Sequence, residues 1–430
     1  MLNHAGIHSS IGLVTKHRLP NKLMKTGLVT LFWALSALGQ VANPPPNRTG
    51  PLTATTLTTP VINTIFYASP GTNTISPLIA AHASGNIKIE LPCGTYIDNL
   101  AITGSNILIQ GAGVNCTFIE PGTNAPVLSI NASKSDSIQY VQLRDLTLQN
   151  TTFTSDGIDI TGPPNQINDW HHFDNLRITG FKYGINIIGR TIWTTLENVH
   201  IGESLVTGLY ANTASVINHF LWHGGQVNNS QSYGIYWNNS SPNLSFSILF
   251  DHVDVEENGL SGTQANCAGL YISGVGSGSF TNGYMEANCV TNPDSLGADI
   301  RIDGTYAQAF DVKSSLIWSQ TNYSIYNTAT QTSGLYEGNR FGGKTNDIKT
   351  ATTHALSYIV VGPNFFDTAN NFVADASGNS HVLDMTTVPV TATPVEGQVV
   401  CYKAVPKTKA APALGHCTSA VGSSGACICN

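Results

Sequence analysis

One short motif recurs eight times between residues 157 and 350, and it limits the fold more than any other feature of the sequence. Each clear copy reads glycine, an apolar residue, an outward residue and a second apolar residue, and the starts lie 23 to 35 residues apart. The clear copies are GIDI (157–160), GINI (184–187), GLYA (208–211), GIYW (234–237) and GLYI (269–272). Degenerate copies follow as DIRI (299–302), SIYN (324–327) and DIKT (347–350). A second β run precedes most copies.

No consistent two-residue turn joins these runs, so they are not hairpins, and the period is too short for four-stranded propeller blades. Coils of this length that stack strand upon strand form a parallel β-solenoid. Parallel crossovers are right-handed in nearly all cases. We therefore predict an all-β, right-handed parallel β-helix of roughly ten coils.

The composition supports this prediction. Charged residues make up only 10% of the 430-residue chain, against roughly 25% in typical soluble domains. Such a chain cannot be mostly surface helix, and its 41% hydrophobic content opposes disorder. The 41 glycines and 39 asparagines supply turn residues. A net charge of −7 without a basic cluster argues against nucleic acid or an anionic membrane surface as partner.

The two ends of the chain have a different character. Residues 1–39 have the layout of a secretory signal peptide, with 1–23 as an upstream extension, and 40–60 form a Pro/Thr-rich linker. We expect the β-helix over 61–385, opened by a short capping helix at 73–84. A linker and a small disulfide-bearing segment follow at 386–430. We expect a secreted, extracellular or periplasmic protein with no membrane attachment after signal cleavage.

Eight cysteines fit an oxidising compartment. Cys93 and Cys116 lie 23 residues apart, and Cys267 and Cys289 lie 22 apart, which is about one coil. Each pair could bridge neighbouring coils. Eight cysteines allow 105 connectivities, so the spacing leaves others open.

The run IELPCGTYIDNLAITGSNILIQGAGVNCTFI (89–119) resembles the opening coils of the pectate lyase superfamily, the pectin-lyase-like parallel β-helix. With the later coils the resemblance covers residues 62–350. It implies the fold, and it leaves the chemistry open because the superfamily includes lyases, hydrolases, epimerases and phage tailspikes. The tail 401–430 more faintly resembles the Cys-containing ends of fibre-like proteins.

Stacked coils place equivalent residues about 4.8 Å apart, so outward positions form columns. One column reads Arg177, His200, Gln226, Asp254, Tyr284, Leu316, and a second reads Thr179, Gly202, Asn228, Glu256, Glu286, Trp318. We predict that Asp254, Glu256 and Glu286 converge as catalytic acid and base, since neighbouring carboxylates raise one another's pKa. Such residues could equally bind turn amides. We expect Arg177, His200 and Trp318 to contact substrate.

The repeated motif gives another outward column: Asp159, Asn186, Tyr210, Tyr236, Tyr271, Arg301, Tyr326, Lys349. Its tyrosines Tyr210, Tyr236 and Tyr271 suit pyranose stacking, or simply stabilise one another across strands. TSDGIDI (154–160) is similar to the N-T-D-G-x-D motif of polygalacturonase-type hydrolases, which implies acid or base roles for Asp156 and Asp159. The two adjacent Asp expected next are replaced by YGINI (183–187).

Lyase chemistry needs a basic residue and often calcium, and Arg301 is the basic candidate. Another possible cleft border is His171 and His172, in an apparent loop insertion at 163–175. We expect no metal or cofactor, with calcium only if the protein is a lyase. The sequence thus favours a polysaccharide hydrolase, with a non-catalytic glycan-binding or tailspike-like β-helix and a polysaccharide lyase as alternatives. It leaves monomer and trimer both open.

Overall fold

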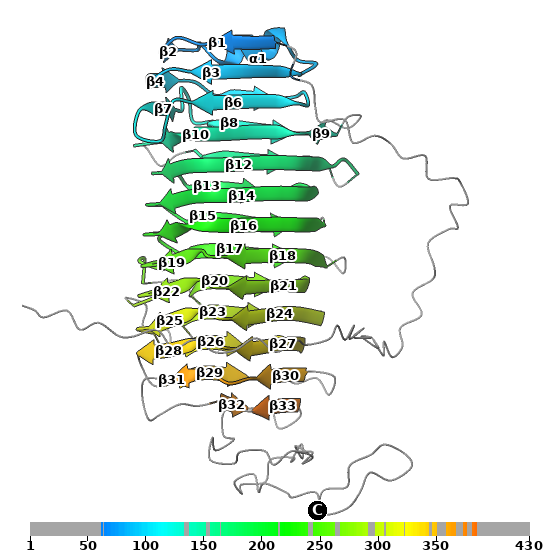
Figure 1. Cartoon of the computed structure of the whole chain (residues 1–430), viewed down its shortest axis with the longest axis vertical. Helices are drawn as coiled ribbons and strands as arrows, with labels where there is room; N and C mark the ends of the chain where they lie inside the picture. The colour runs from blue at the N-terminus through cyan, green and yellow to red at the C-terminus, as the bar shows by residue number, and fades with distance from the viewer. Residues whose placement is uncertain are drawn as a thin grey trace, which may run out of the picture. The chain divides into compact units, whose positions relative to one another are not determined.

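The computed structural model describes residues 62–384, except positions 63, 133–136, 152–154, 164, 214–215, 240–243, 263–266, 291–296, 305–306, 322, 344–345, 351–357, 367–372 and 376–380. The predicted signal peptide (1–39), the linker (40–60) and the C-terminal segment (386–430) lie outside these residues. Figure 1 shows the described part as strands stacked coil upon coil. None of its helices is long and apolar enough to span a membrane.

All strand pairings are parallel, and they form two sheets of 22 and 11 strands, here called sheet A and sheet B. Sheet B consists of β5 (Leu100–Ile102), β8 (Leu128–Asn131), β11 (Ile158–Thr161), β13 (Tyr183–Ile187), β15 (Thr207–Thr213), β17 (Tyr233–Asn239), β20 (Ala268–Ser273), β23 (Ala298–Asp303), β26 (Tyr323–Asn327), β29 (Asn346–Thr350) and β32 (Val373–Asp375). The repeated motif therefore forms one continuous sheet, as predicted.

Sheet A is bent into two arms. The first arm contains β1 (Thr64–Tyr67), β3 (Ile87–Leu91), β6 (Ile107–Gly111), β9 (Ile138–Gln139), β18 (Ser245–Asp251), β21 (Val275–Thr281), β24 (Ala307–Lys313), β27 (Gln331–Glu337), β30 (Tyr358–Val361) and β33 (His381–Asp384). The second arm contains β2 (Gly71–Thr72), β4 (Gly94–Ile97), β7 (Thr117–Glu120), β19 (Asp254–Glu256), β22 (Tyr284–Glu286), β25 (Leu316–Ser319), β28 (Arg340–Gly343) and β31 (Phe365–Phe366). Four long strands cross both arms, namely β10 (Val141–Gln149), β12 (Asn168–Thr179), β14 (Thr191–Gly202) and β16 (Ile217–Asn228).

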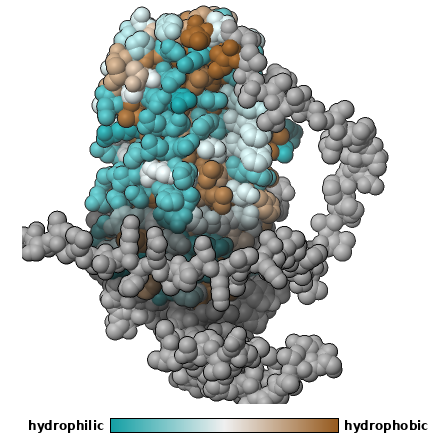
Figure 2. All heavy atoms as spheres, viewed as in Figure 1, coloured by the Kyte–Doolittle hydropathy of each residue, from teal (hydrophilic) through white to brown (hydrophobic). Residues whose placement is uncertain are grey.

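The interior consists of apolar columns in register. In sheet B one column is Leu100, Leu128, Ile158, Ile185, Leu209, Ile235, Leu270, Ile300, Ile325 and Ile348. Every member is at most 1% exposed, and burying one such side chain contributes roughly 1.5–3 kcal/mol. Figure 2 shows the opposite pattern outside, a largely hydrophilic surface with scattered apolar residues. The shortage of charge is thus explained by apolar columns inside and neutral polar residues outside.

The bend between the arms has a repeated cause. One residue per coil adopts a left-handed backbone with φ between 49° and 67°. These residues are Asp145, Asn175, Asn198, Gly224, His252, Asn282, Ser314 and Gly338. Asparagine tolerates this conformation better than most residues. It also links coils: Asn175 Nδ2 donates to Asp145 Oδ1 at 2.9 Å, and Asn198 Nδ2 to Asn175 Oδ1 at 3.4 Å. Side-chain amides at the bend therefore join neighbouring coils.

Helix α1 (Ser76–Ala81) covers the first coil. It is shorter than the predicted 73–84 because Asn73 has a left-handed φ of 52° and Pro77 stands in the first turn. Asp98 Oδ2 accepts the backbone N–H groups of Ile75 and Ser76, at 2.9 and 3.0 Å, and so satisfies the helix start.

Both proposed cysteine pairs in the described chain are disulfides, Cys93–Cys116 and Cys267–Cys289. One prediction is wrong: residues 163–175 are not a loop insertion, because 168–175 belong to β12. His171 points inward and is 1% exposed, and burial lowers its pKa to about 3. This histidine therefore cannot border a cleft.

Candidate functional site

The outward face of the second arm carries both columns that the sequence predicted. The register pairs Arg177, His200, Gln226, Asp254, Tyr284 and Leu316 in succession. It likewise pairs Thr179, Gly202, Asn228, Glu256, Glu286 and Trp318. The geometric part of the prediction is confirmed. We call this surface the second-arm face.

Three carboxyl groups meet near the middle of the second-arm face. Asp254 and Glu256 lie on β19, and Glu286 is the register partner of Glu256 on β22. All three are half-buried. Gln226 Nε2 donates to Glu256 Oε2 at 2.8 Å, and the Tyr284 hydroxyl donates to Glu286 Oε2.

Their surroundings favour a protonated carboxyl. Burial raises the pKa of Glu256, and the nearby Asp254 carboxylate raises it further, while the hydrogen bond from Gln226 opposes the shift. Burial also raises the pKa of Asp254, against the influence of His200. The Tyr284 hydroxyl has a raised pKa because of burial and its hydrogen bond to Glu286, so it remains a donor. The cluster thus combines a proton donor with carboxylate acceptors.

A polar groove of about 470 Å³ lies on the coils that precede the three carboxyl groups, which do not themselves line it. Its lining includes Arg177 and His200, and it extends along the columns to Gln226 and Asn228, the positions directly before Asp254 and Glu256. The side chains of Arg177 and His200 are exposed. At the other end, Trp318 follows Glu286 and is 39% exposed. A chain of sugars could lie along this line and meet cationic, acidic and aromatic groups in turn.

Sheet B carries the second-choice acids. Asn186 Nδ2 donates to Asp156 Oδ2 and to Asp159 Oδ1, at 3.1 Å each, so one amide joins the two carboxyl groups. Burial and the charge of Asp156 raise the pKa of Asp159 to about 6. Burial also raises that of Asp156. Arg301, which shares an outward column with Asp159, lies five coils away at about 24 Å.

Arg301 is also poorly placed as a lyase base. It is 5% exposed, pairs with Asp303 at 3.5 Å and lies 5.1 Å from the ring centre of Tyr326. A guanidinium held in this way stabilises the sheet, and its charge is already balanced by Asp303.

The tyrosine column on sheet B is present, with its rings stacked on each other. The ring centres of Tyr210 and Tyr236 lie 5.3 Å apart and those of Tyr236 and Tyr271 4.8 Å, and Tyr183, which is in register with Thr207, adds a ring 4.5 Å from Tyr210. Their planes differ by 10° to 17°. Because the ring faces cover one another, this column presents ring edges and hydroxyls to a ligand, and cross-strand stacking accounts for it.

Two groups of residues were missed from the sequence. Tyr140, Trp170, Trp193 and His219 stack along one corner, all with left-handed φ. His223, Asp251 and His252 gather at the bend of sheet A, and among the described residues they form the one group suited to a metal ion. An alignment of β12 with β14 would have shown that Trp170 and Trp193 are neighbours. No pattern in the sequence indicated that His223, Asp251 and His252 would meet.

Comparisons with known proteins agree with the architecture. No family model matches the sequence, and no curated protein matches it. Among solved structures, the A-module of the mannuronan C-5 epimerase AlgE6 from Azotobacter vinelandii aligns with a TM-score of 0.50 and 15% identity, over 74% of this chain and 94% of that one.

This likeness confirms the predicted parallel β-helix architecture. Two further structures align with lower scores. Tailspike protein 2 of the Escherichia coli O157:H7 bacteriophage CAB120 has a TM-score of 0.47 and 14% identity, over 72% of this chain and 44% of that one. Alginate lyase from Paenibacillus sp. str. FPU-7 has a TM-score of 0.43 and 11% identity, over 74% and 99%. At such identities the likeness concerns the fold alone.

Proposed function

We propose that this protein binds a polysaccharide along the second-arm face and hydrolyses it there. The observation that carries the proposal is the meeting of Asp254, Glu256 and Glu286 on adjacent coils beside the polar groove. The named activities of structures with this fold, an epimerase and a lyase among them, give a polysaccharide ligand additional support.

The proposed roles follow from the surroundings of each carboxyl group. Glu256, with its raised pKa, protonates the leaving oxygen as general acid. Glu286, oriented by the Tyr284 hydroxyl, acts as nucleophile. Strands about 4.8 Å apart hold carboxyl groups close together, and a separation of roughly 5–5.5 Å accompanies retention at the anomeric carbon. Asp254 adds negative charge, which keeps Glu256 protonated and stabilises a cationic transition state.

The test is a panel of acidic and neutral polysaccharides incubated with the purified full chain. Hydrolysis releases reducing ends without the ultraviolet absorbance of an unsaturated product, whereas a lyase gives both signals. Binding without either signal indicates a non-catalytic, tailspike-like protein and would contradict our proposal.

Matched variants then locate the centre. Glu256→Gln and Glu286→Gln each lose about 100-fold or more in kcat/KM, the usual scale of acid–base catalysis. Glu337→Gln, an acid-to-amide change on the first arm at the end of β27, keeps full activity. If Asp159→Asn abolishes activity while Glu256→Gln does not, the centre lies on sheet B, where the raised pKa of Asp159 makes it the rival acid.

We also propose that the protein works outside the cytoplasm. The disulfides Cys93–Cys116 and Cys267–Cys289 support an oxidising compartment. Expression with the first 60 residues fused to a reporter tests this: export and cleavage are expected, and a reporter retained in the cytoplasm would contradict the proposal.

A further inference from the structure

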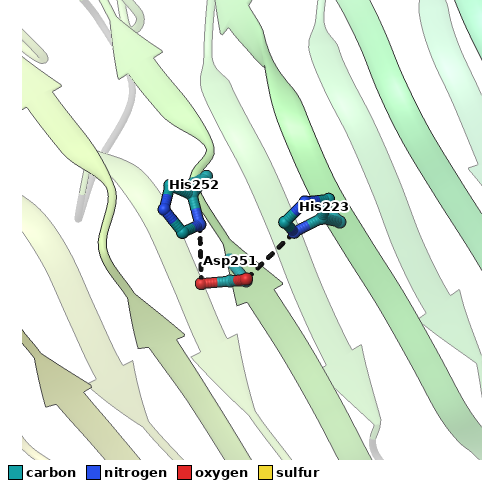
Figure 3. A group of neighbouring side chains, drawn as sticks. All are labelled: His223, Asp251 and His252. Atoms are coloured by element: carbon teal, nitrogen blue, oxygen red, sulfur yellow. Dashed lines mark hydrogen bonds and ion pairs between the residues drawn. The ribbon is translucent and has the colours of Figure 1, made fainter.

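Two histidines share one carboxylate at the bend of sheet A. His223 lies near the middle of β16, Asp251 ends β18, and His252 is the left-handed bend residue that follows it. His223 Nδ1 lies 2.9 Å from Asp251 Oδ2, and His252 Nδ1 lies 3.0 Å from Asp251 Oδ1. Figure 3 shows both rings directing Nδ1 at this carboxylate from opposite sides.

The group is open to solvent yet anchored. The side chains of His223 and His252 are 50% and 58% exposed, while that of Asp251 is 28% exposed. Thr281 Oγ1 and Asn282 Nδ2 both donate to Asp251 Oδ1, at 3.0 and 2.9 Å. Oδ2 thus contacts only a histidine among these partners. Hydrogen bonds that fix a ligating carboxylate are the usual outer support of a metal site.

We propose that His223, Asp251 and His252 bind a divalent transition-metal ion of the zinc or copper class. The three ligand atoms lie within 4.8 Å of one another. Zinc lies about 2.0–2.2 Å from nitrogen and oxygen ligands in a tetrahedral arrangement, so its ligand atoms stand roughly 3.4 Å from one another and a rearrangement of at most about 1.4 Å would close the site. Two imidazoles favour zinc, copper or nickel over calcium, which takes oxygen ligands.

An ion here would clamp two coils together. The hydrogen bonds from Thr281 and Asn282 do not involve the histidines, so they can hold the Asp251 carboxylate in place when an ion is bound. A neutral histidine binds a metal through Nδ1 when its proton is on Nε2. Binding therefore requires a change of tautomer and no loss of a proton from either neutral ring. The exposed rings leave room for water at the remaining positions. The site lies at the bend, where His252 precedes Asp254 of the proposed hydrolytic centre by two residues, so metal binding has to be measured separately from hydrolysis.

The test uses the untagged, metal-free full chain, titrated with Zn²⁺ by calorimetry and with Co²⁺ by visible spectroscopy. We expect one ion per chain and a cobalt spectrum of nitrogen and oxygen ligands, without the intense thiolate band that cysteine binding would give. His223→Gln and His252→Asn should each weaken binding by at least about tenfold. Asparagine suits the second position because neighbouring coils carry it at the same left-handed bend, at Asn282 for example.

His172→Gln is the matched control. His172 is an exposed histidine on the same sheet that meets a single carboxylate, Glu197, at 3.3 Å, and it has no second imidazole in the group. This variant should bind Zn²⁺ like the parent chain. Unchanged affinity in both His223→Gln and His252→Asn, equal loss in His172→Gln, or no binding at millimolar Zn²⁺ would each overturn the proposal.

Discussion

At the residue scale, the surroundings of Asp159 raise the pKa of its carboxyl group. Its carboxyl group is half-buried, with Asp156 close by and the Asn186 amide between them. Water and the amide cannot offset both burial and the second charge, so the pKa rises from 3.8 to about 6. The folded protein therefore holds this proton more tightly than the unfolded chain does.

This raised pKa predicts a pH-dependent cost to stability. The ionised form of Asp159 is disfavoured on folding, so the cost is absent below about pH 4, grows as pH rises toward 6 and is fully present above it. Asp159→Asn, which stays neutral, should raise the urea midpoint at about pH 7 and leave it unchanged near pH 3.5. An equal shift of the midpoint at both pH values would contradict this assignment.

At the element scale, the glycine of the repeated motif is explained by close packing. We expected glycine to serve mainly at turns with positive φ, but the first residue of each clear copy is absent from the positive-φ positions. A Cβ on Gly208 would lie 2.2 Å from Val227 Cγ2 and 2.7 Å from the Gly234 carbonyl oxygen. The motif glycine thus lets each strand of sheet B approach the interior and the next coil.

Gly208→Ala should therefore destabilise the protein by about 1–3 kcal/mol, the usual cost of overpacking. Gly202→Ala is the control, because its Cβ would meet only the end of the Asn228 side chain, at 2.9 Å. Urea unfolding followed by circular dichroism measures both. Equal effects of the two substitutions would contradict the packing explanation of the motif glycine.

Periodicity explains what the sequence could predict. Side chains alternate along each strand and the coils stack in register, so the sequence determines which residues share a column. The order of the column from Arg177 to Leu316 could therefore be predicted from the sequence. The positions of the bends could not be predicted from the sequence, because five residue types (Asn, Gly, Ser, Asp and His) occupy them. The group at His223 and the burial of His171 depend on those bends. Ring stacking in the tyrosine column also depends on side-chain rotamers that no spacing specifies.

At the scale of the whole molecule, a solenoid is stabilised by contacts between neighbouring coils, so a cross-link acts locally. Cys93–Cys116 and Cys267–Cys289 close loops of 23 and 22 residues, each worth about 3 kcal/mol by loop entropy. Reduction should increase amide hydrogen exchange near each disulfide and leave the coils around 184–237 protected. Uniform loss of protection along the chain would instead mean that the β-helix unfolds as one unit.

The low charge of the chain makes any cluster of acidic side chains on its surface unusual. With only 10% charged residues, three carboxyl groups on adjacent coils of the second-arm face stand out against a neutral surface. The direct measurement is the release of reducing ends from a responsive polysaccharide by the parent chain, Glu256→Gln and Glu286→Gln. We expect hydrolysis by the parent chain and a loss of about 100-fold or more in kcat/KM in both variants, with folding intact. Full activity in both variants would contradict it.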